Sequence, residues 1–289
     1  MPHTDYSYLV SIIMPSYNCE SFIKASIKSV IAQEYENWEL LISDDCSNDD
    51  TLKIIKSYCD KDIRISMITS NTNLGPAVSR NKAIEKAKGR FIAFLDSDDI
   101  ILDNHLQVLF DFIRLNAIKD ALLFTSFAIK KNGVLKDIPL IKLEGNPLDY
   151  FLRNPVIPTR VCLSKRISME FEFREDAIVT EDTIYWIEVS NKYPVYQIPE
   201  KTVYYCLHDD NSVNISNDGY IKTLKGLNNF RKDKPELFKK ISKKIRINVV
   251  SELYFGISKY YIFKGNRFLS VINLLKSFMI NPFHHQFKH

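Results

Sequence analysis

Hydrophobic and polar positions alternate between two periods over the first hundred residues. Short apolar runs, several of them rich in β-branched residues, predict four buried strands, at 8–14, 38–42, 63–68 and 91–95. The segments between them repeat apolar positions with helical spacing, at 21–33, 51–59 and 77–87. Strands that are apolar on both faces and separated by helices are typical of βαβ units. The expected fold class is therefore α/β, a Rossmann-like, mainly parallel sheet flanked by helices.

The pattern stays mixed as far as about residue 216 and then becomes purely helical. Two more helices are expected in the mixed part, at 103–116 and 181–193, and four more strands, at 122–129, 156–163, 195–198 and 202–207. Beyond Gly219 helices are expected over about 234–261, with a break, and over 267–278. This change predicts a first domain over 1–218 and a C-terminal helical extension over 219–289.

Composition indicates an ordinary globular protein. The 289 residues, 45% hydrophobic and 26% charged, suit one large domain or a domain with an appendage. The five cysteines are scattered and form no CxxC pair, which favours reduced thiols over a disulfide framework or a zinc knuckle. The first residues lack a signal-peptide pattern, and no window approaches the roughly 18 apolar residues of a membrane span. We therefore expect a cytoplasmic protein.

Positive charge is concentrated in one C-terminal segment. Between Arg231 and Arg246 the sequence has eight Lys or Arg and two acidic residues, whereas the whole chain carries a net charge of +4. Apolar residues recur there at helical spacing, at Leu237, Ile241, Ile245, Val249 and Leu253. The segment predicts a basic amphipathic helix that lies on an anionic membrane, or one packed on the first domain with a solvated cationic face. Its aromatic residues follow no nucleic-acid-binding motif, so no nucleic-acid partner is expected.

Polar residues follow three of the predicted strands at the point where each ends. Ser16-Tyr17-Asn18 follows the first strand, Asp44-Asp45 the second, and Asp96–Asp99 the fourth. Ligands of parallel α/β sheets bind at the carboxyl ends of the strands. Three polar clusters at one edge therefore outline a binding site.

The acidic run Asp96-Ser97-Asp98-Asp99 has the composition of a metal site. Two carboxylates one residue apart can chelate a hard divalent cation such as Mn²⁺ or Mg²⁺, which then bridges phosphate oxygens. The alternative is a solvated acidic turn that caps the helix near Asp103. Because three crowded carboxylates after a buried strand repel one another, the run favours a counter-ion.

Two further polar turns admit both a structural and a binding role. In the turn Asp44–Thr51, Asp49 or Asp50 suits a helix cap, while another Asp can accept the N3–H of uracil. In 73–81, Arg80 lies early in a predicted helix, where its guanidinium can reach a nucleotide or steer the acidic run. A surface arginine is the alternative.

Together these segments resemble a known family. SIIMPSYN (11–18), DDCSNDDT (44–51), NLGPAVSRN (73–81) and FLDSDD (94–99) are similar to the successive signatures of family 2 inverting glycosyltransferases. The resemblance covers about the first third of the chain and continues less sharply to about residue 216. It implies a GT-A fold with a nucleotide-sugar-binding half over 1–102 and an acceptor-binding half over 103–218.

The resemblance also implies a role for individual side chains. The donor-binding residues would be Pro15, Tyr17, Asn18, Asp45, Arg80, Asp96 and Ser97. In that set Tyr17 would stack on uracil, Asp45 would bind its edge and Asp96 would face the ribose and donor sugar. Asp98 would be the main metal ligand, while Asp99 would orient the acceptor or the loop.

The implied general base is Asp182, in the segment Thr180-Glu181-Asp182 that resembles the acidic helix start of the family. A carboxylate within hydrogen-bond reach of the acceptor hydroxyl can take its proton. Glu175, Asp176 and Glu181 are competing candidates. A structural alternative remains, because Thr180 or Asp182 also suits a helix N-cap.

His208 belongs to a stretch, 204–216, that resembles the closing signature of the family. The resemblance implies that His208 contacts the diphosphate or ligates the metal, and imidazole suits Mn²⁺ better than Mg²⁺. A lone histidine at a strand end is otherwise polar surface. Two departures affect donor geometry: Cys46 replaces the usual glycine, which freely takes positive φ, and Cys206 replaces the usual arginine.

The function that the resemblance implies is inverting, non-processive transfer of a hexose or N-acetylhexosamine from a UDP-sugar. No QxxRW signature of processive synthases follows any glutamine. The expected acceptor is a saccharide, lipid-linked at the inner face of the plasma membrane, in O-antigen or capsule synthesis. A nucleotidyltransferase and a non-catalytic nucleotide-sugar-binding protein are the alternatives. The sequence leaves the donor sugar, the linkage and the oligomeric state open.

Overall fold

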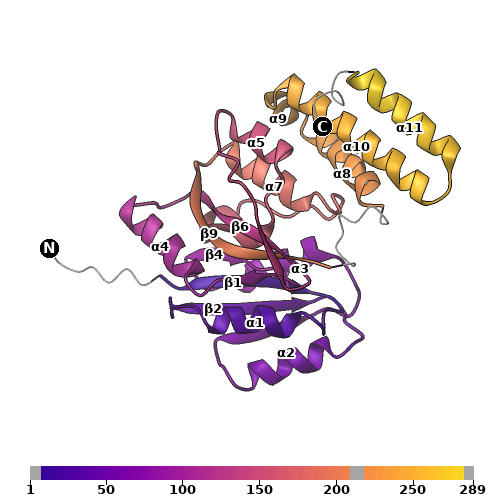
Figure 1. Cartoon of the computed structure of the whole chain (residues 1–289). Coiled ribbons are helices and arrows are strands. Elements are labelled where there is room, and N and C mark those ends of the chain that lie inside the picture. The colour runs from indigo at the N-terminus through magenta and orange to yellow at the C-terminus, as the bar shows by residue number, and fades with distance from the viewer. Residues whose placement is uncertain (1–7, 209–217, 283–289) are drawn as a thin grey trace. The chain divides into compact units, whose positions relative to one another are not determined.

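A computed structural model describes residues 8–208 and 218–282 (Figure 1). The chain groups into two compact units. The first comprises Met1–Lys142, Val156–Phe173 and Lys192–Leu207, and the second comprises Leu143–Pro155, Arg174–Asn191 and His208–His289. The second unit thus takes in two segments that precede the predicted boundary at residue 218. The predicted functional halves, 1–102 and 103–218, stay predictions.

The first unit is built on one mixed sheet. Its described strands are β1 (Val10–Ser16), β2 (Trp38–Asp44), β3 (Ile65–Thr69), β4 (Phe91–Phe94), β5 (Ile100–Ile101), β6 (Leu122–Lys131), β7 (Val134–Asp137), β8 (Val161–Ser164) and β9 (Val195–Leu207). Their order is β3-β2-β1-β4-β8-β6-β9-β5, with β7 paired to β6. Strands β3, β2, β1 and β4 are parallel, while β8 is antiparallel to both of its neighbours. The expected parallel, Rossmann-like part is therefore confirmed.

Helices cover both faces of the parallel part. They are α1 (Ile23–Ile31), α2 (Thr51–Cys59), α3 (Pro76–Lys86) and α4 (His105–Leu115), with a 3₁₀ turn at Pro158–Arg160 and a short α6 (Lys165–Ser168). Buried apolar residues of α1, α2 and α4 form one core with alternate residues of β1, such as Ile12 and Met14. The helix α3 packs on β1 and β2 from the other face (Figure 1).

The predicted strands and helices of the first hundred residues are confirmed, with ends that shift by one or two residues. Two predicted strands, 195–198 and 202–207, are a single strand β9 whose pairing with β6 shifts in register around Pro199. Proline lacks the N–H that a regular ladder needs, so the strand continues past an irregularity. Strands β5 and β7 are too short to give a periodic signal and were not predicted.

The second unit is helical in its described part. Its helices are α5 (Pro147–Arg153), α7 (Glu181–Ser190), α8 (Gly219–Asp233), α9 (Pro235–Lys240), α10 (Lys243–Phe263) and α11 (Arg267–Ile280). The expected helical C-terminal part and its break are confirmed. Among the described residues, no helix combines the length and hydrophobicity needed to cross a membrane.

The prediction of one basic amphipathic helix over 231–246 is wrong. This segment covers the end of α8, all of α9 and the start of α10. Pro235 opens α9 because its fixed φ suits the first helical position, and the extended backbone of Ile241 ends it. Ile241 and Leu253 of the predicted apolar stripe are buried. The stripe is thus at least partly a packing surface of the second unit.

Candidate functional site

The predicted site lies at the carboxyl edge of the parallel strands in the first unit. Ser16 and Asp44 are partners in the register of β1 and β2, and Asp45 N donates to Ser16 O at 2.8 Å. Pro15 is buried inside β1, whereas the Tyr17 ring that follows is 47% exposed. The ring is therefore accessible to a ligand at this edge of the sheet.

The turns after β1 and β2 are held together by Asn18. Its backbone N donates to Ser47 Oγ at 2.9 Å, and its Oδ1 accepts from Asn48 N at 2.9 Å. Asn18 takes a left-handed φ of 45°, a conformation that asparagine tolerates better than most residues. In this structure Asn18 therefore shapes the wall of the site.

Asp44 and Asp45 have different tasks although they are adjacent. Asp44 is fully buried and accepts from Ser47 N and Oγ, at 2.9 Å and 2.6 Å, which closes the turn after β2. Asp45 accepts from Leu74 N at 2.9 Å and from Gly75 N at 2.6 Å. The side chain predicted to bind uracil therefore also fixes the turn that leads into α3.

Cys46 adopts the conformation of the glycine that it replaces. Its φ is 68°, in the left-handed region that costs a residue with a Cβ roughly 1–2 kcal/mol. Its Sγ contacts Asn71 O at 3.5 Å. The cysteine at this position therefore lies in a strained backbone conformation that glycine would adopt freely.

Arg80 and Asp96 form an ion pair between α3 and the acidic run. Arg80 Nη2 lies 2.8 Å from Asp96 Oδ1, and Arg80 is only 4% exposed. Its guanidinium carbon also lies 5.4 Å from the centroid of the Phe173 ring. The alternative of a surface arginine is thus wrong. The guanidinium contacts the acidic run, as one of the two predicted roles requires, while contact with a nucleotide stays a prediction.

Asp99, the last residue of the acidic run, is fully buried. Thr159 Oγ1 donates to its Oδ2 at 2.7 Å, and Cys206 N donates to its Oδ1 at 3.0 Å. Burial, with the charges of Asp98 and Asp96, raises the pKa of the Asp99 carboxyl well above its usual range. Asp99 therefore joins the acidic run to β9 and the 3₁₀ turn, and it does not face solvent.

Sequence reasoning missed two residues that hold the acidic run. Ser26 Oγ of α1 donates to the carbonyls of Ser97 and Asp99, at 2.8 Å each. Thr159 Oγ1 also accepts from Asp96 N at 3.1 Å. Neither residue belongs to a recognisable sequence motif. Each contacts residues that are far away in the sequence, and such contacts leave no local pattern.

Asp98 is the carboxylate of the run that suits a divalent cation. It is partly exposed, unlike the buried Asp99, and Asp96 already pairs with Arg80. Among residues 8–208 and 218–282, no three His, Cys, Asp or Glu side chains form a group that could hold a metal ion. Mg²⁺-type sites commonly take one or two protein carboxylates and complete their shell with substrate phosphates and water. The single carboxylate of Asp98 is compatible with a cation of that kind, which would take its other ligands from outside these side chains.

Asp182 lies in the first turn of α7, within the second unit, and is partly exposed. Its Oδ1 accepts from Thr183 N at 2.5 Å, while Thr180 at the N-cap makes no capping hydrogen bond through its side chain. Val179, just before, has a φ of 74°, which is strained for a β-branched residue. Such strain is often found at functional sites.

The competing carboxylates near Asp182 differ from it in their surroundings. Asp176 accepts two hydrogen bonds from Arg174, both of 3.0 Å, and this guanidinium holds the pKa of Asp176 below its usual range. A carboxylate with a lowered pKa is a weaker base. Glu181 is buried and Glu175 is exposed.

His208, the predicted ligand, follows β9 and is partly buried. The rest of its stretch, 209–216, lies outside the described residues.

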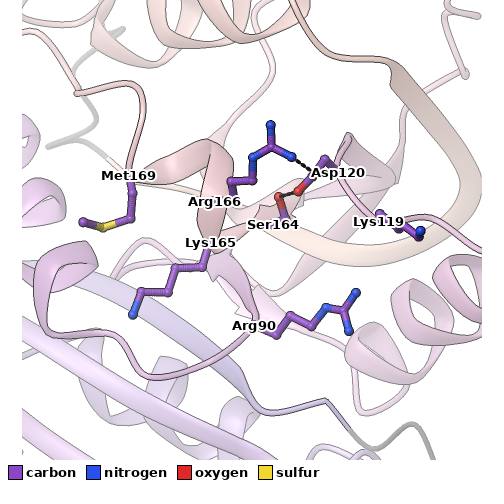
Figure 2. Close-up of a pocket in the computed structure, with 7 residues that line it drawn as sticks. All are labelled: Arg90, Lys119, Asp120, Ser164, Lys165, Arg166 and Met169. Atoms are coloured by element: carbon purple, nitrogen blue, oxygen red, sulfur yellow. Dashed lines mark hydrogen bonds and ion pairs between the residues drawn. The ribbon is translucent and has the colours of Figure 1, made fainter.

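A basic pocket of about 460 Å³ is lined by residues that include Arg90 and Lys165 (Figure 2). Because Arg90 directly precedes β4, the pocket lies at the opposite end of that strand from the acidic run. Arg90, Lys119, Lys165 and Arg166 contribute its cationic side chains. Asp120 lies among them, accepting from Ser164 Oγ at 2.6 Å and from Arg166 Nη1 at 2.7 Å. Part of the positive charge is therefore neutralised inside the cavity itself.

Comparison with known proteins identifies the family. The model of Glycosyl transferase family 2 matches residues 11–160. A UDP-Glc:alpha-D-GlcNAc-diphosphoundecaprenol beta-1,3-glucosyltransferase, WfgD of Escherichia coli, is 46% identical over 185 residues, which are 63% of this chain and 70% of that protein. The putative teichuronic acid biosynthesis glycosyltransferase TuaG of Bacillus subtilis is 38% identical over 152 residues, which are 53% of this chain and 55% of that protein.

Solved structures share the fold. TarS 1–349 of S. aureus, in complex with UDP-GlcNAc, superimposes with a TM-score of 0.61 at 19% identity and covers 97% of this chain and 92% of that one. The mannosyltransferase PcManGT of Pyrobaculum calidifontis, in complex with GDP-Man and Mn²⁺, gives 0.64 at 14% identity, covering 100% and 90%. At such identities the likeness shows the GT-A-like fold alone. The chain spans about half the length of TuaG and 70% of WfgD. The family model and the Escherichia coli relative together show that this chain belongs to glycosyl transferase family 2.

Proposed function

We propose that this glycosyltransferase moves glucose from UDP-glucose to a GlcNAc residue carried on a lipid diphosphate, and that the new linkage is β. The choice of sugars rests on the likeness to WfgD, whose name specifies that donor and acceptor. The single structural observation that supports a nucleotide-sugar site is the connected set Asp45, Arg80 and Asp96 at the carboxyl edge of the sheet. With such an acceptor the reaction would take place at the inner face of the plasma membrane, in surface-polysaccharide synthesis such as that of O-antigen or capsule.

The donor would lie across the ends of β1, β2 and β4. Tyr17 would stack on the uracil ring, with Pro15 and Asn18 forming the wall behind it. Asp45 would accept the N3–H of uracil while it continues to hold the turn before α3. Asp96 and Ser97 would meet the ribose and the sugar, and the ion pair with Arg80 would keep the Asp96 carboxylate in place.

Asp98 would hold a Mn²⁺ or Mg²⁺ ion together with the donor diphosphate, and His208 would approach the same group. A divalent cation there supplies neutralisation of the charge that develops on the departing UDP. The crowding of three carboxylates in the run supports this assignment, because their mutual repulsion would be relieved by a counter-ion.

Asp182 would take the proton of the acceptor hydroxyl as its oxygen attacks the anomeric carbon. The bond between that carbon and the UDP oxygen breaks on the opposite side, so an α-linked donor gives a β-linked product. Asp176 is a poorer candidate, because its ion pair with Arg174 lowers its pKa. The strained Val179 before α7 supports a functional role for this helix start.

Thermal denaturation in the presence of ligands tests the donor assignment. UDP-glucose with Mn²⁺ is expected to raise the melting temperature, while GDP-mannose and dTDP-glucose raise it less, because purine and thymine do not match the uracil pocket. Absence of any stabilisation by UDP compounds would contradict the assignment. A nucleotidyltransferase would instead release pyrophosphate from a nucleoside triphosphate and a sugar phosphate, and a non-catalytic binding protein would bind UDP-glucose without any transfer.

A further inference from the structure

The hairpin of α10 and α11 packs through small polar side chains. Ser277 Oγ donates to Ser251 O at 2.7 Å, and Ser251 Oγ lies 3.1 Å from both Ser277 O and Ser277 Oγ. About two helical turns further along the hairpin, the hydroxyls of Ser258 and Ser270 lie 3.0 Å apart. These serines and Asn273 are all buried. Serine hydroxyl groups from both helices thus line the contact between α10 and α11.

The other side of α11 is apolar and exposed. Ser270, Asn273 and Ser277 share the inward face, since they are spaced three and four residues apart. The large exposed side chains of α11 are Phe268, Val271, Leu275, Phe278 and Met279, which we call the apolar face. Phe268 is 74% exposed and Met279 84%. A helix of a water-soluble domain normally buries its apolar stripe and exposes its polar side. In α11 the polar side is buried and the apolar side is exposed.

The same hairpin carries a strong positive charge. Between Lys243 and Pro282 the sequence has seven Lys or Arg and a single acidic residue, Glu252. Six of these cations are exposed, namely Lys243, Lys244, Lys259, Lys264, Arg267 and Lys276. At the end of α10, next to exposed Ile262 and Phe263, Lys264 Nζ lies 5.7 Å from the Tyr260 ring centroid. Exposed apolar, aromatic and basic side chains in one element are typical of a membrane-interface segment.

We propose that the α10–α11 hairpin docks on an anionic lipid bilayer, with the apolar face among the acyl chains and the basic side chains at the headgroups. Helices that meet lipid commonly pack through small residues and serine hydroxyls, as this hairpin does. A second copy of the chain is the poorer occupant, because two hairpins of the same strong positive charge repel each other. The proposed membrane contact thus lies on α10 and α11, which share only residues 243–246 with the predicted basic segment 231–246.

The test is co-sedimentation of the full chain with vesicles of phosphatidylcholine alone or of phosphatidylcholine with phosphatidylglycerol. Wild type is expected to bind the anionic vesicles, and to bind them less as salt is raised. The variant Phe268→Glu/Leu275→Glu should lose at least about tenfold in the partition coefficient. The matched control is Ile63→Glu/Leu115→Glu, which changes two exposed apolar residues of the first unit, 99% and 80% exposed, and should bind as wild type does.

Circular dichroism and light scattering on the same samples complete the design. Both variants should keep the helical signal and the mass of wild type, because all four side chains are exposed. Wild type that ignores anionic vesicles, or a hairpin variant that binds them undiminished, would overturn the proposal. A hairpin variant that lowers the oligomeric mass and leaves vesicle binding unchanged would assign the apolar face to a second copy. Vesicle binding needs no sugar donor, so this outcome is separate from that of the proposed function.

Discussion

Arg80 of α3 and Asp96 at the end of β4 are joined by an ion pair of 2.8 Å in which the arginine is buried. The pair links the turn held by Asp45 to the acidic run that is proposed to meet the donor. A buried guanidinium lacks full hydration, and burying its charge costs free energy. The ion pair with the Asp96 carboxylate offsets part of that cost. If the donor binds here as proposed, the pair is expected to couple the stability of this edge of the sheet to donor binding.

Replacing Arg80→Met should lower the free energy of unfolding by about 2 kcal/mol, because a charge-assisted hydrogen bond is lost and Asp96 is left unpaired. UDP-glucose binding should weaken by about tenfold, measured by calorimetry. The control is Arg166→Met, which breaks a pair whose arginine side chain is 70% exposed and should cost less than about 1 kcal/mol.

A double-mutant cycle with Asp96→Asn measures the coupling within the pair. The second substitution should recover part of the stability lost in Arg80→Met, because it removes the unpaired charge. Effects that add within about 0.3 kcal/mol would show that the pair contributes nothing of its own.

Asp98→Asn should remove the effect of Mn²⁺ on UDP binding. In wild type, UDP affinity is expected to fall when the metal is chelated, because the diphosphate shares its cation with Asp98. In the variant, calorimetry should give the same weak affinity with and without Mn²⁺. Asp103→Asn, an exposed carboxylate a few residues further along, should retain the wild-type response. Equal metal dependence in both variants would exclude Asp98 as the ligand.

Asp182→Asn should lower the rate constant of transfer by about 100-fold to 10,000-fold and leave the affinity for UDP unchanged, since general-base catalysis contributes on that scale. Asp176→Asn is the matched comparison and should retain most of the rate, because Asp176 is paired with Arg174. Steady-state kinetics on both variants decides between them. If Asp176→Asn is the slower enzyme, the base has been assigned to the wrong carboxylate.

Cys46→Gly should raise the free energy of unfolding by about 1 kcal/mol. The residue has a φ of 68°, which glycine adopts without the steric cost of a Cβ. Chemical denaturation of wild type and variant gives the difference. A loss of stability would mean that the contact between Cys46 Sγ and Asn71 O matters more than the strain.

Glu188→Gln should stabilise the protein at neutral pH and not in acid. Burial raises the pKa of Glu188 above its usual value, while Lys234 and Arg174 lower it in part. Because the folded state then holds the proton more tightly than the unfolded state, this carboxyl favours folding below its unfolded pKa, and the benefit is lost as pH rises through the folded pKa. Glutamine does not titrate. Unfolding at pH of about 4 and about 7.5 should therefore show a gain only at the higher pH, and an equal difference at both would contradict the assigned shift.

The sequence predicted the part of the fold in which local pattern and tertiary structure agree. Apolar runs, followed by polar clusters that begin at Ser16, Asp44 and Asp96, predicted the strands and the edge at which their ends meet. The burial of Asp99 was not predictable, because its partners Thr159 and Cys206 lie 60 and 107 positions away. The helix period predicted α11 but not which of its sides faces inward, since serine hydroxyl pairs replace the usual apolar packing.

The central claim is transfer of glucose with inversion, and the anomeric configuration of the product tests it most directly. The purified chain is incubated with UDP-glucose, Mn²⁺ and a GlcNAc-diphospho-lipid acceptor, and the product is analysed by proton NMR. We expect a new disaccharide whose anomeric coupling constant identifies a β linkage, formed only when donor and acceptor are both present. An α linkage, or no transfer from UDP-glucose to this acceptor, would contradict the account.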